Sequence, residues 1–295
     1  MSRDLVVRGE NIASATCVKP AGIDIAEGLR WAIARRNPAY RRRLLERRRQ
    51  PPACKPGWEI GPPDYVGIGV EKAGTSWWWW LLRRHPGVSE PGPTKEINFL
   101  QNLETDSIDE AAVLAYHRFF PRRPGTLVGE WTPNYNELPQ LSLLDRLAPD
   151  ARLIMLVRDP IERYRSGTEM HRRYGMGDPR SVQFEEKAVE RGMYASILDR
   201  VRQALPRHEL LVLQYERCVG DSAGELARTY RFLGLDDGFR PTWVRHRVNR
   251  TPGTRLPISD EARRQLVDLY EPDVARFARM APEIDLGLWP DFGLR

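Results

Sequence analysis

Cysteine is scarce in this chain, and long hydrophobic runs are missing. Its 295 residues include three cysteines, Cys17, Cys54 and Cys218, which are too widely spaced for a disulfide framework or a cluster of metal ligands. No run of about 18 apolar residues is present, so the sequence predicts no membrane span. The first residues, MSRDLVVRGENIAS, lack the apolar core of a signal peptide. We therefore expect a cytoplasmic protein without a metal site.

The excess of positive charge belongs to one short part of the chain. Lys and Arg number 46 against 40 Asp and Glu, which gives a net charge of +6. Nine arginines and one acid lie between Arg30 and Arg49, and the rest of the chain is close to neutral. A basic arm of this kind could bind a polyanion. No aromatic-interleaved basic stripe supports nucleic-acid binding, so we interpret the arm as a solvated helix face and keep polyanion binding as an alternative.

Proline and glycine divide the chain into two parts. The stretch PPACKPGWEIGPP holds five prolines and two glycines, a composition typical of a linker or an extended lead-in. The sequence therefore predicts a basic N-terminal arm and lead-in over residues 1–62 and a single domain over residues 63–295.

Beyond this stretch, short apolar runs alternate with segments of helical spacing. The runs, which we expect to be strands, are Tyr65–Val70, Thr126–Gly129, Arg152–Val157 and Leu210–Tyr215. The expected helices are Ser76–His85, Leu138–Leu147, Ile161–Tyr174, Val182–Ala204, Ser222–Leu233 and Ser259–Met280. Continuous hydrophobicity is typical of parallel strands covered on both faces. The pattern predicts a three-layer α/β/α fold with a central, mostly parallel sheet.

The first expected strand runs into a glycine loop and then a helix. In this layout, backbone N–H groups and the helix dipole hold a phosphate. The spacing of Gly69 and Gly74 matches a nucleotide P-loop, but Thr75 stands where that motif requires lysine, and Lys72 lies inside the loop instead. The strand at 152–157 is followed by Arg158 before any acid that could hold Mg²⁺. A kinase or other P-loop nucleotide-binding protein is therefore disfavoured, and it stays as an alternative.

A second candidate anion site follows the strand at 152–157. Arg158 comes directly after the strand, at the sheet edge where open α/β sheets bind ligands. Ser166 lies about two helical turns further on and could offer a hydroxyl to the same group. Otherwise, Arg158 would pair with a carboxylate and Ser166 would be an ordinary helix residue. Two anion sites of this kind indicate a ligand that carries phosphates at two positions.

The spacing of several motifs resembles that of PAPS-dependent sulfotransferases (PAPS is 3′-phosphoadenylyl sulfate), in particular the branch that acts on carbohydrates and heparan sulfate. The resemblance covers about Tyr65 to Tyr270 in the expected order. The motifs are Lys72-x-Gly-Thr-Ser-x5-Leu82-x2-His85-Pro86, Lys95-Glu96-Ile-Asn-Phe99, Gly129-Glu-Trp-Thr-Pro-Asn-Tyr135, Arg158-Asp-Pro-x2-Arg-x2-Ser166, Gly192-Met-Tyr194-x3-Leu198, Asp221–Leu235 and Arg250-Thr-Pro-Gly-Thr-Arg255.

The resemblance implies a P-loop-like fold, PAPS as donor, no metal, and roles for named residues. Glu96 would be the general base, although without the surrounding pattern a surface ion pair with Lys95 would be the favoured interpretation. Lys72 would be catalytic and stabilise the bridging oxygen, and Arg158 and Ser166 would hold the 3′-phosphate. The other residues implied in cofactor binding are Ala73, Gly74, Thr75, Ser76 and Trp77 of the phosphate loop and its helix, and Arg250, Thr254 and Arg255 of a late loop.

Two departures from the family pattern bear on the acceptor. Trp131 stands where many relatives have lysine, and Asn98 stands where they often have histidine. Both changes favour a neutral or partly apolar acceptor, such as a sugar hydroxyl, a glycosylated or nucleoside-like secondary metabolite, or a lipid-linked headgroup. Of the four tryptophans from Trp77 to Trp80, we expect most to pack in the core and Trp77 to form an apolar wall with Trp131 on the acceptor side.

Overall fold

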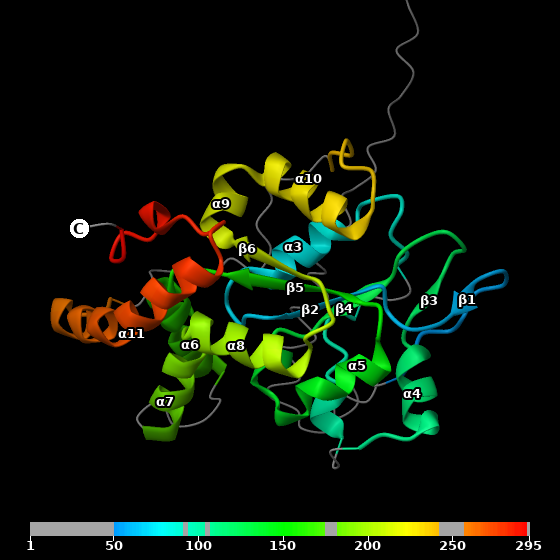
Figure 1. Ribbon diagram of the computed structural model, residues 1–295, viewed down its shortest axis with the longest axis horizontal. Helices are drawn as coiled ribbons and strands as arrows, with labels where there is room; N and C mark the ends of the chain where they lie inside the picture. The colour runs from blue at the N-terminus through cyan, green and yellow to red at the C-terminus, as the bar shows by residue number, and fades with distance from the viewer. Residues whose placement is uncertain (1–49, 91–93, 104–106, 175–181, 242–256, 294–295) are drawn as a thin grey trace, which may run out of the picture. The chain divides into compact units, whose positions relative to one another are not determined.

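The computed structural model describes residues 50–90, 94–103, 107–174, 182–241 and 257–293 (Figure 1). These residues belong to one compact unit that begins at residue 48. The basic arm lies outside the described residues, and so do Arg250, Thr254 and Arg255 of the late loop. The domain boundary between residues 62 and 63 stays a prediction. Within the described ranges, no helix is long and apolar enough to cross a membrane.

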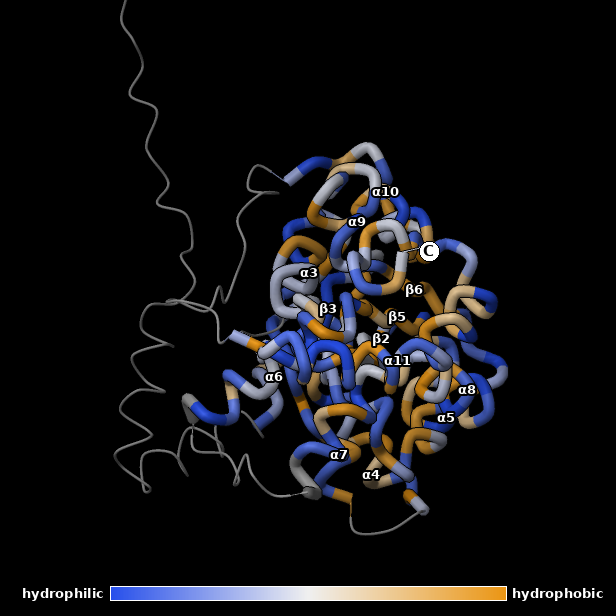
Figure 2. The backbone as a smooth tube through the Cα atoms, turned by 90° about the vertical axis from the view of Figure 1, so that its left-hand side faces the viewer, coloured by the Kyte–Doolittle hydropathy of each residue, from blue (hydrophilic) through white to orange (hydrophobic). Residues whose placement is uncertain are grey.

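A four-stranded parallel sheet forms the centre of the unit. Its strands stand in the order β4 (Gly129–Trp131), β2 (Tyr65–Gly69), β5 (Arg152–Val157) and β6 (Leu210–Gln214). All five residues of β2 are buried, and hydrophobic residues dominate β5 and β6 (Figure 2). Continuous apolar runs thus form strands that are covered on both faces, as the sequence predicts.

Helices cover both faces of the sheet. On one side lie α3 (Thr75–Leu82), α9 (Tyr215–Gly220) and α10 (Ser222–Leu233), and on the other lie α5 (Leu144–Leu147), α6 (Pro160–Tyr174) and α8 (Tyr194–Ala204) (Figure 1). The long helix α11 (Asp260–Met280) packs against α8 and α6. The predicted three-layer α/β/α fold is confirmed.

Smaller elements complete the unit at its margins. Strands β1 (Glu59–Ile60) and β3 (Pro121–Arg122) pair antiparallel outside the main sheet. The remaining elements are the α-helices α4 (Glu110–His117) and α7 (Val182–Glu190) and the 3₁₀ helices η1 (Leu100–Asn102), η2 (Tyr135–Glu137), η3 (Pro139–Leu143) and η4 (Leu286–Leu288).

Three expected elements differ from the structure. The helix expected at 138–147 is the 3₁₀ helix η3, with a proline in its first turn, followed by the four-residue α5. The strand expected at 126–129 lies at 129–131, because Glu130 is fully buried although its charge marks it as a surface residue. The helix expected at 182–204 is divided into α7 and α8 around Gly192. A Cβ atom at Gly192 would lie 2.7 Å from the ring of Tyr270, so the chain approaches this ring more closely than a helix of larger residues would allow.

The tryptophan run of α3 packs mainly into the core, as the sequence predicts. Trp77, Trp78 and Trp79 are buried, and Trp78 Nε1 donates to Thr229 Oγ1 at 3.1 Å. Trp80 is half-buried, with the Arg84 guanidinium 4.4 Å from its ring centre. The run therefore fixes α3 against α10, and with it the loop that precedes α3.

Trp131 is the core residue that sets the distance between β4 and β2. Its side chain has no exposed surface, its indole N–H donates to Gly69 O at 3.2 Å, and its ring covers Gly67. The sequence-based interpretation of Trp131 as an acceptor wall is therefore corrected, since the ring offers no surface to a ligand.

We expect the Gly67→Ala variant to lower the free energy of unfolding by about 1–3 kcal/mol, because the added Cβ would overpack the site. That atom would stand 2.1 Å from the Trp131 ring. Gly220→Ala is the control, since a Cβ there meets no atom within 4 Å. Denaturant unfolding of both variants checks this, and equal stabilities would contradict the packing described.

Candidate active site at the carboxyl edge of the sheet

The loop between β2 and α3 is shaped by two left-handed residues. Gly74 (φ 95°) precedes the first turn of α3, and Lys72 has φ 70°. A Cβ at Gly74 would lie 2.7 Å from the Tyr215 ring, so glycine is required by both the backbone angle and the close approach. The first amides of α3 have no partner within the helix. The loop thus presents backbone donors and a helix N-terminus at the carboxyl edge of the sheet, as the glycine spacing predicts.

Lys72 leaves this loop with a largely buried side chain. Its Nζ lies 3.4 Å from Met170 Sδ of α6, a weak acceptor. Burial lowers the pKa of Lys72, and the neighbouring cations Arg158 and Lys95 lower it further, while Glu71 acts in the opposite direction. The structure therefore places three cations close enough to repel one another.

Lys95 joins the loop to Glu96. Its Nζ lies 3.0 Å from Thr75 Oγ1 and 2.9 Å from Glu96 Oε1. The Lys95 side chain is 10% exposed and that of Glu96 is 36% exposed. The expected ion pair exists, but it is half-buried and hydrogen-bonded to the first residue of α3. Glu96 thus stands beside the phosphate-type loop with a partly exposed side chain.

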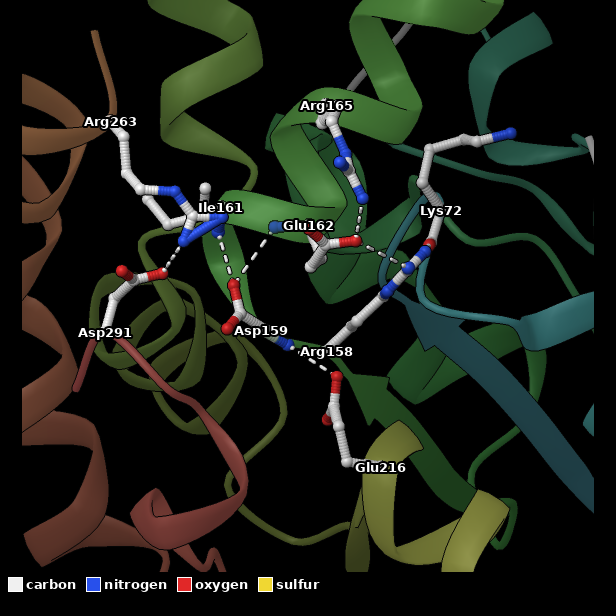
Figure 3. A network of polar contacts seen from close by, with 9 residues as sticks. All are labelled: Lys72, Arg158, Asp159, Ile161, Glu162, Arg165, Glu216, Arg263 and Asp291. Atoms are coloured by element: carbon white, nitrogen blue, oxygen red, sulfur yellow. Dashed lines mark hydrogen bonds and ion pairs between the residues drawn. The ribbon is translucent and has the colours of Figure 1, made fainter. Parts of the chain in front are cut away.

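Arg158 follows β5 and reaches toward the same loop (Figure 3). Its two terminal nitrogens make long contacts of 3.4 Å to Lys72 O and Glu162 Oε2, and its guanidinium lies 5.0 Å from the Tyr215 ring centre. Its Nε is buried and has no hydrogen-bond partner in the described part of the chain. Buried donors are normally satisfied, and an anionic ligand would satisfy this one.

Two carboxylates hold the turn that carries Arg158 (Figure 3). Asp159 caps α6 by accepting from the amides of Ile161 (2.9 Å) and Glu162 (3.0 Å). The Asp159 amide donates to Glu216 Oε1 at 3.0 Å, and Trp289 Nε1 donates to the other oxygen of Glu216 at the same distance. Burial, with a smaller effect from Glu216, raises the pKa of Asp159 to about 6. The turn is therefore fixed from both sides.

The other candidate residues lie in distinct places. Ser166 is in α6, next to Gly167, where a Cβ atom would contact Lys72 Cγ at 3.9 Å. Trp77 is 3% exposed and packs edge-on against Trp78 and Tyr215, and its buried indole N–H has no partner in the described residues. Ala73 is fully buried under the loop, and Ser76 is half-buried in the first turn of α3.

Trp77 packs against Tyr215, and Trp131 covers Gly67 of β2. Of the expected common wall of Trp77 and Trp131, the part of Trp77 stays a prediction. Asn98 has a left-handed backbone (φ 54°), and its side-chain amide donates to Glu96 O at 3.2 Å. Asn98 therefore shapes the loop that carries Glu96.

Comparison with known proteins shows which proteins this chain resembles. A family model described as the sulfotransferase family matches residues 107–239, which include Arg158 and Ser166. The heparan sulfate glucosamine 3-O-sulfotransferase 6 of Homo sapiens is 32% identical over 200 residues. Over these residues the chain is similar to members of the sulfotransferase family. A solved sulfotransferase from Alicyclobacillus acidocaldarius shares the fold, with a TM-score of 0.62, 23% identity, and coverage of 78% of this chain and 100% of that one.

The matches to relatives are partial. The alignment with the 3-O-sulfotransferase 6 covers 63% of this chain and 56% of the relative. The heparan sulfate glucosamine 3-O-sulfotransferase 3B1 of Mus musculus is 29% identical over 254 residues, which is 74% of this chain and 63% of the relative. The chain thus spans less than two-thirds of the length of these curated relatives.

The structure brings Lys72, Arg158 and the Lys95–Glu96 pair to one edge, and it adds residues that sequence reasoning missed. Tyr215 contacts Trp77 and Arg158 and fills the space above Gly74. Its position directly after the strand at 210–214 was the available signal. Lys95 was considered only as an ion-pair partner, because nothing in the sequence indicates its contact with Thr75.

We expect the Lys95→Met variant to raise the pKa of Lys72, because it removes a cation that lowers that pKa. NMR titration of lysine side-chain signals measures the shift, with Lys55→Met as the control. A Lys72 pKa that falls or does not move in Lys95→Met would contradict the arrangement of cations described above.

Proposed function

We propose that this chain is a PAPS-dependent sulfotransferase that moves a sulfuryl group to a hydroxyl of a small-molecule, glycoside or carbohydrate acceptor by in-line transfer. Glu96 acts as general base in this proposal. The observation that carries it is the meeting of Lys72, Lys95 and Arg158 beside a phosphate-type loop, with a buried guanidinium nitrogen left unpaired.

The residues present fit such a donor. Lys72 and the amides of Gly74, Thr75 and Ser76 would hold its 5′-phosphosulfate end, since they lie at the N-terminus of α3. Arg158 would hold the 3′-phosphate, with Ser166 of α6 as a hydroxyl donor. Arg158 and Trp77 both contact the Tyr215 ring, and each has a buried N–H without a partner in the described residues, which supports a ligand bound near this side chain.

The chemistry needs a base, a charge clamp and alignment. When bound, PAPS supplies the sulfuryl group, and its 5′-phosphate oxygen takes the electrons of the broken S–O bond. Glu96 accepts the proton of the acceptor hydroxyl as the new S–O bond forms. Lys72 donates to the bridging oxygen, and its lowered pKa suits proton donation. Lys95 donates to Glu96 Oε1 at 2.9 Å and would hold this carboxylate in place.

Support for the acceptor class comes from the relatives and from Asn98. Both named relatives are described as acting on glucosamine of heparan sulfate, which favours a sugar hydroxyl. Asn98 brings a neutral polar side chain to the loop that carries Glu96, and it stays a candidate contact for an uncharged acceptor.

Incubation with PAPS and a panel of hydroxylated glycosides and metabolites is expected to yield a product heavier by one SO₃ group, detected by mass spectrometry. In the Glu96→Ala variant, we expect kcat to fall by about 10²–10⁴-fold, the usual contribution of a general base. Glu209→Gln is the control, because that carboxylate is exposed and pairs with Arg152 at the start of β5. Full turnover by Glu96→Ala would rule out the assigned base.

Binding of PAP, the desulfated product, tests the 3′-phosphate station separately. We expect Arg158→Ala to weaken PAP binding by at least about tenfold, because a charge-assisted hydrogen bond is worth roughly 1.5–3 kcal/mol. Arg152→Ala, at the other end of β5 and 42% exposed, should leave the affinity unchanged. Calorimetry compares the two, and tight binding that survives Arg158→Ala would remove Arg158 from the site.

A further inference from the structure

A buried carboxylate lies behind the Glu96 loop. Glu130 of β4 has no exposed surface and accepts four hydrogen bonds, two on each oxygen. The donors are Tyr116 OH (2.7 Å) and Tyr135 OH (3.0 Å) on Oε1, and Thr132 Oγ1 (2.6 Å) and the Ile97 amide (3.2 Å) on Oε2. Burial raises the pKa of Glu130, and these four donors act against that rise. We call Glu130, Tyr116, Thr132 and Tyr135 the Glu130 cluster.

The cluster holds three consecutive backbone amides directly after Glu96. The Ile97 amide donates to Glu130 itself. The next two amides donate to side chains that in turn donate to Glu130: Asn98 N to Thr132 Oγ1 at 3.3 Å, and Phe99 N to Tyr135 OH at 3.0 Å. The hydroxyls of Thr132 and Tyr135 therefore each accept from a loop amide and donate to Glu130. The hydrogen bond from the amide thus sets the direction in which each hydroxyl donates.

The residue before Glu96 is held from the same strand. The Trp131 amide of β4 donates to Lys95 O at 3.0 Å. The backbone is thus fixed on both sides of Glu96, while the Glu96 carboxylate itself remains 36% exposed. The backbone at Glu96 is therefore held by hydrogen bonds, while its side chain stays accessible to a substrate.

A buried carboxylate of this kind is a costly way to fill a core. Removing a charge from water costs several kcal/mol, and a well-packed apolar residue of similar volume is often as stabilising or more so. Stability alone therefore does not explain why a glutamate stands at position 130. Holding three amides in one direction is a task that an apolar side chain cannot perform.

We propose that Glu130 is a positioning residue that sets the place of the Glu96 carboxylate beside Thr75 and Lys95 through its hold on residues 97–99. This inference rests on the proposed function for the role of Glu96 as base. A small displacement of a catalytic group can reduce the rate by about 10²-fold, so the support of Glu96 affects turnover directly.

The test begins with Glu130→Gln, which preserves the shape of the side chain but replaces one acceptor oxygen by an NH₂ group. Glu225→Gln is the matched control: Glu225 is 5% exposed, pairs with Arg228 at 3.0 Å, and lies in α10, which packs on the edge strand β6 rather than on β4. We expect both variants to bind PAP within about twofold of wild type, and kcat to fall by about 10–100-fold in Glu130→Gln alone. Equal kcat values in the two variants would overturn the inference.

A double-mutant cycle separates positioning from general damage. If Glu130 acts through Glu96, adding Glu130→Gln to Glu96→Ala should change kcat by no more than about twofold. Multiplication of the two single effects would show that Glu130 acts elsewhere. Tyr135→Phe serves as a second variant, because it removes only the hydroxyl that joins Phe99 N to Glu130.

Hydrogen exchange tests the hold on the loop without any need for turnover. In Glu130→Gln, the amides of residues 97–99 should exchange at least about tenfold faster, and in Glu225→Gln they should not change. If the exchange rates of the amides of residues 97–99 are unchanged in Glu130→Gln, the inference is overturned, whatever the effect of this variant on kcat. A wild-type chain that transfers no sulfuryl group to any acceptor would instead refute the proposed function, and the exchange result would still decide the role of the cluster.

Discussion

The mutual repulsion of three cations at one sheet edge is the constraint around which this site is built. Lys72, Lys95 and Arg158 come from three separate segments. Burial is the main cause of the lowered pKa of Lys72, and the other two cations add smaller effects in the same direction. Lys72 contacts a thioether, and Lys95 contacts Glu96 and the Thr75 hydroxyl. Arg158 makes contacts of 3.4 Å to Lys72 O and Glu162. The fold must supply rigid supports to keep them together, and it does so with the buried tryptophans of α3, the Asp159–Glu216 turn and the Glu130 cluster.

The site uses carboxylates in two different ways, which are set by burial alone. Glu96 is partly exposed, pairs with Lys95 and is the base that we propose. Glu130 is fully buried and saturated by four donors, so its lone pairs are committed to structure. The two side chains are joined through a single stretch of backbone. One residue type thereby serves for reactivity and for support within the same sheet edge.

The sequence alone predicts the features that depend on local pattern. Buried apolar runs locate β2, β5 and β6, and the glycine spacing with Lys72 locates the phosphate-type loop. Sequence patterns mislead where a charged or otherwise unexpected residue type is buried in the fold. Glu130 was assigned no role because a charge normally marks the surface, and Trp131 was placed at the acceptor because its need to cover Gly67 is visible only when β4 and β2 pair. Contacts between segments distant in the chain, such as Tyr215 with Gly74, are likewise absent from any local pattern.

Nucleotide preference tests the central claim most directly, namely that two anion stations on this edge recognise a 3′,5′-phosphorylated donor. Calorimetric titration of the full chain with PAP, with adenosine 5′-monophosphate, and with ATP and Mg²⁺ compares the alternatives under one condition. The account predicts that PAP binds at least about tenfold more tightly than either other nucleotide and that Mg²⁺ adds nothing, since the 3′-phosphate gains a charge-assisted contact with Arg158. Tighter, Mg²⁺-dependent binding of ATP would contradict it.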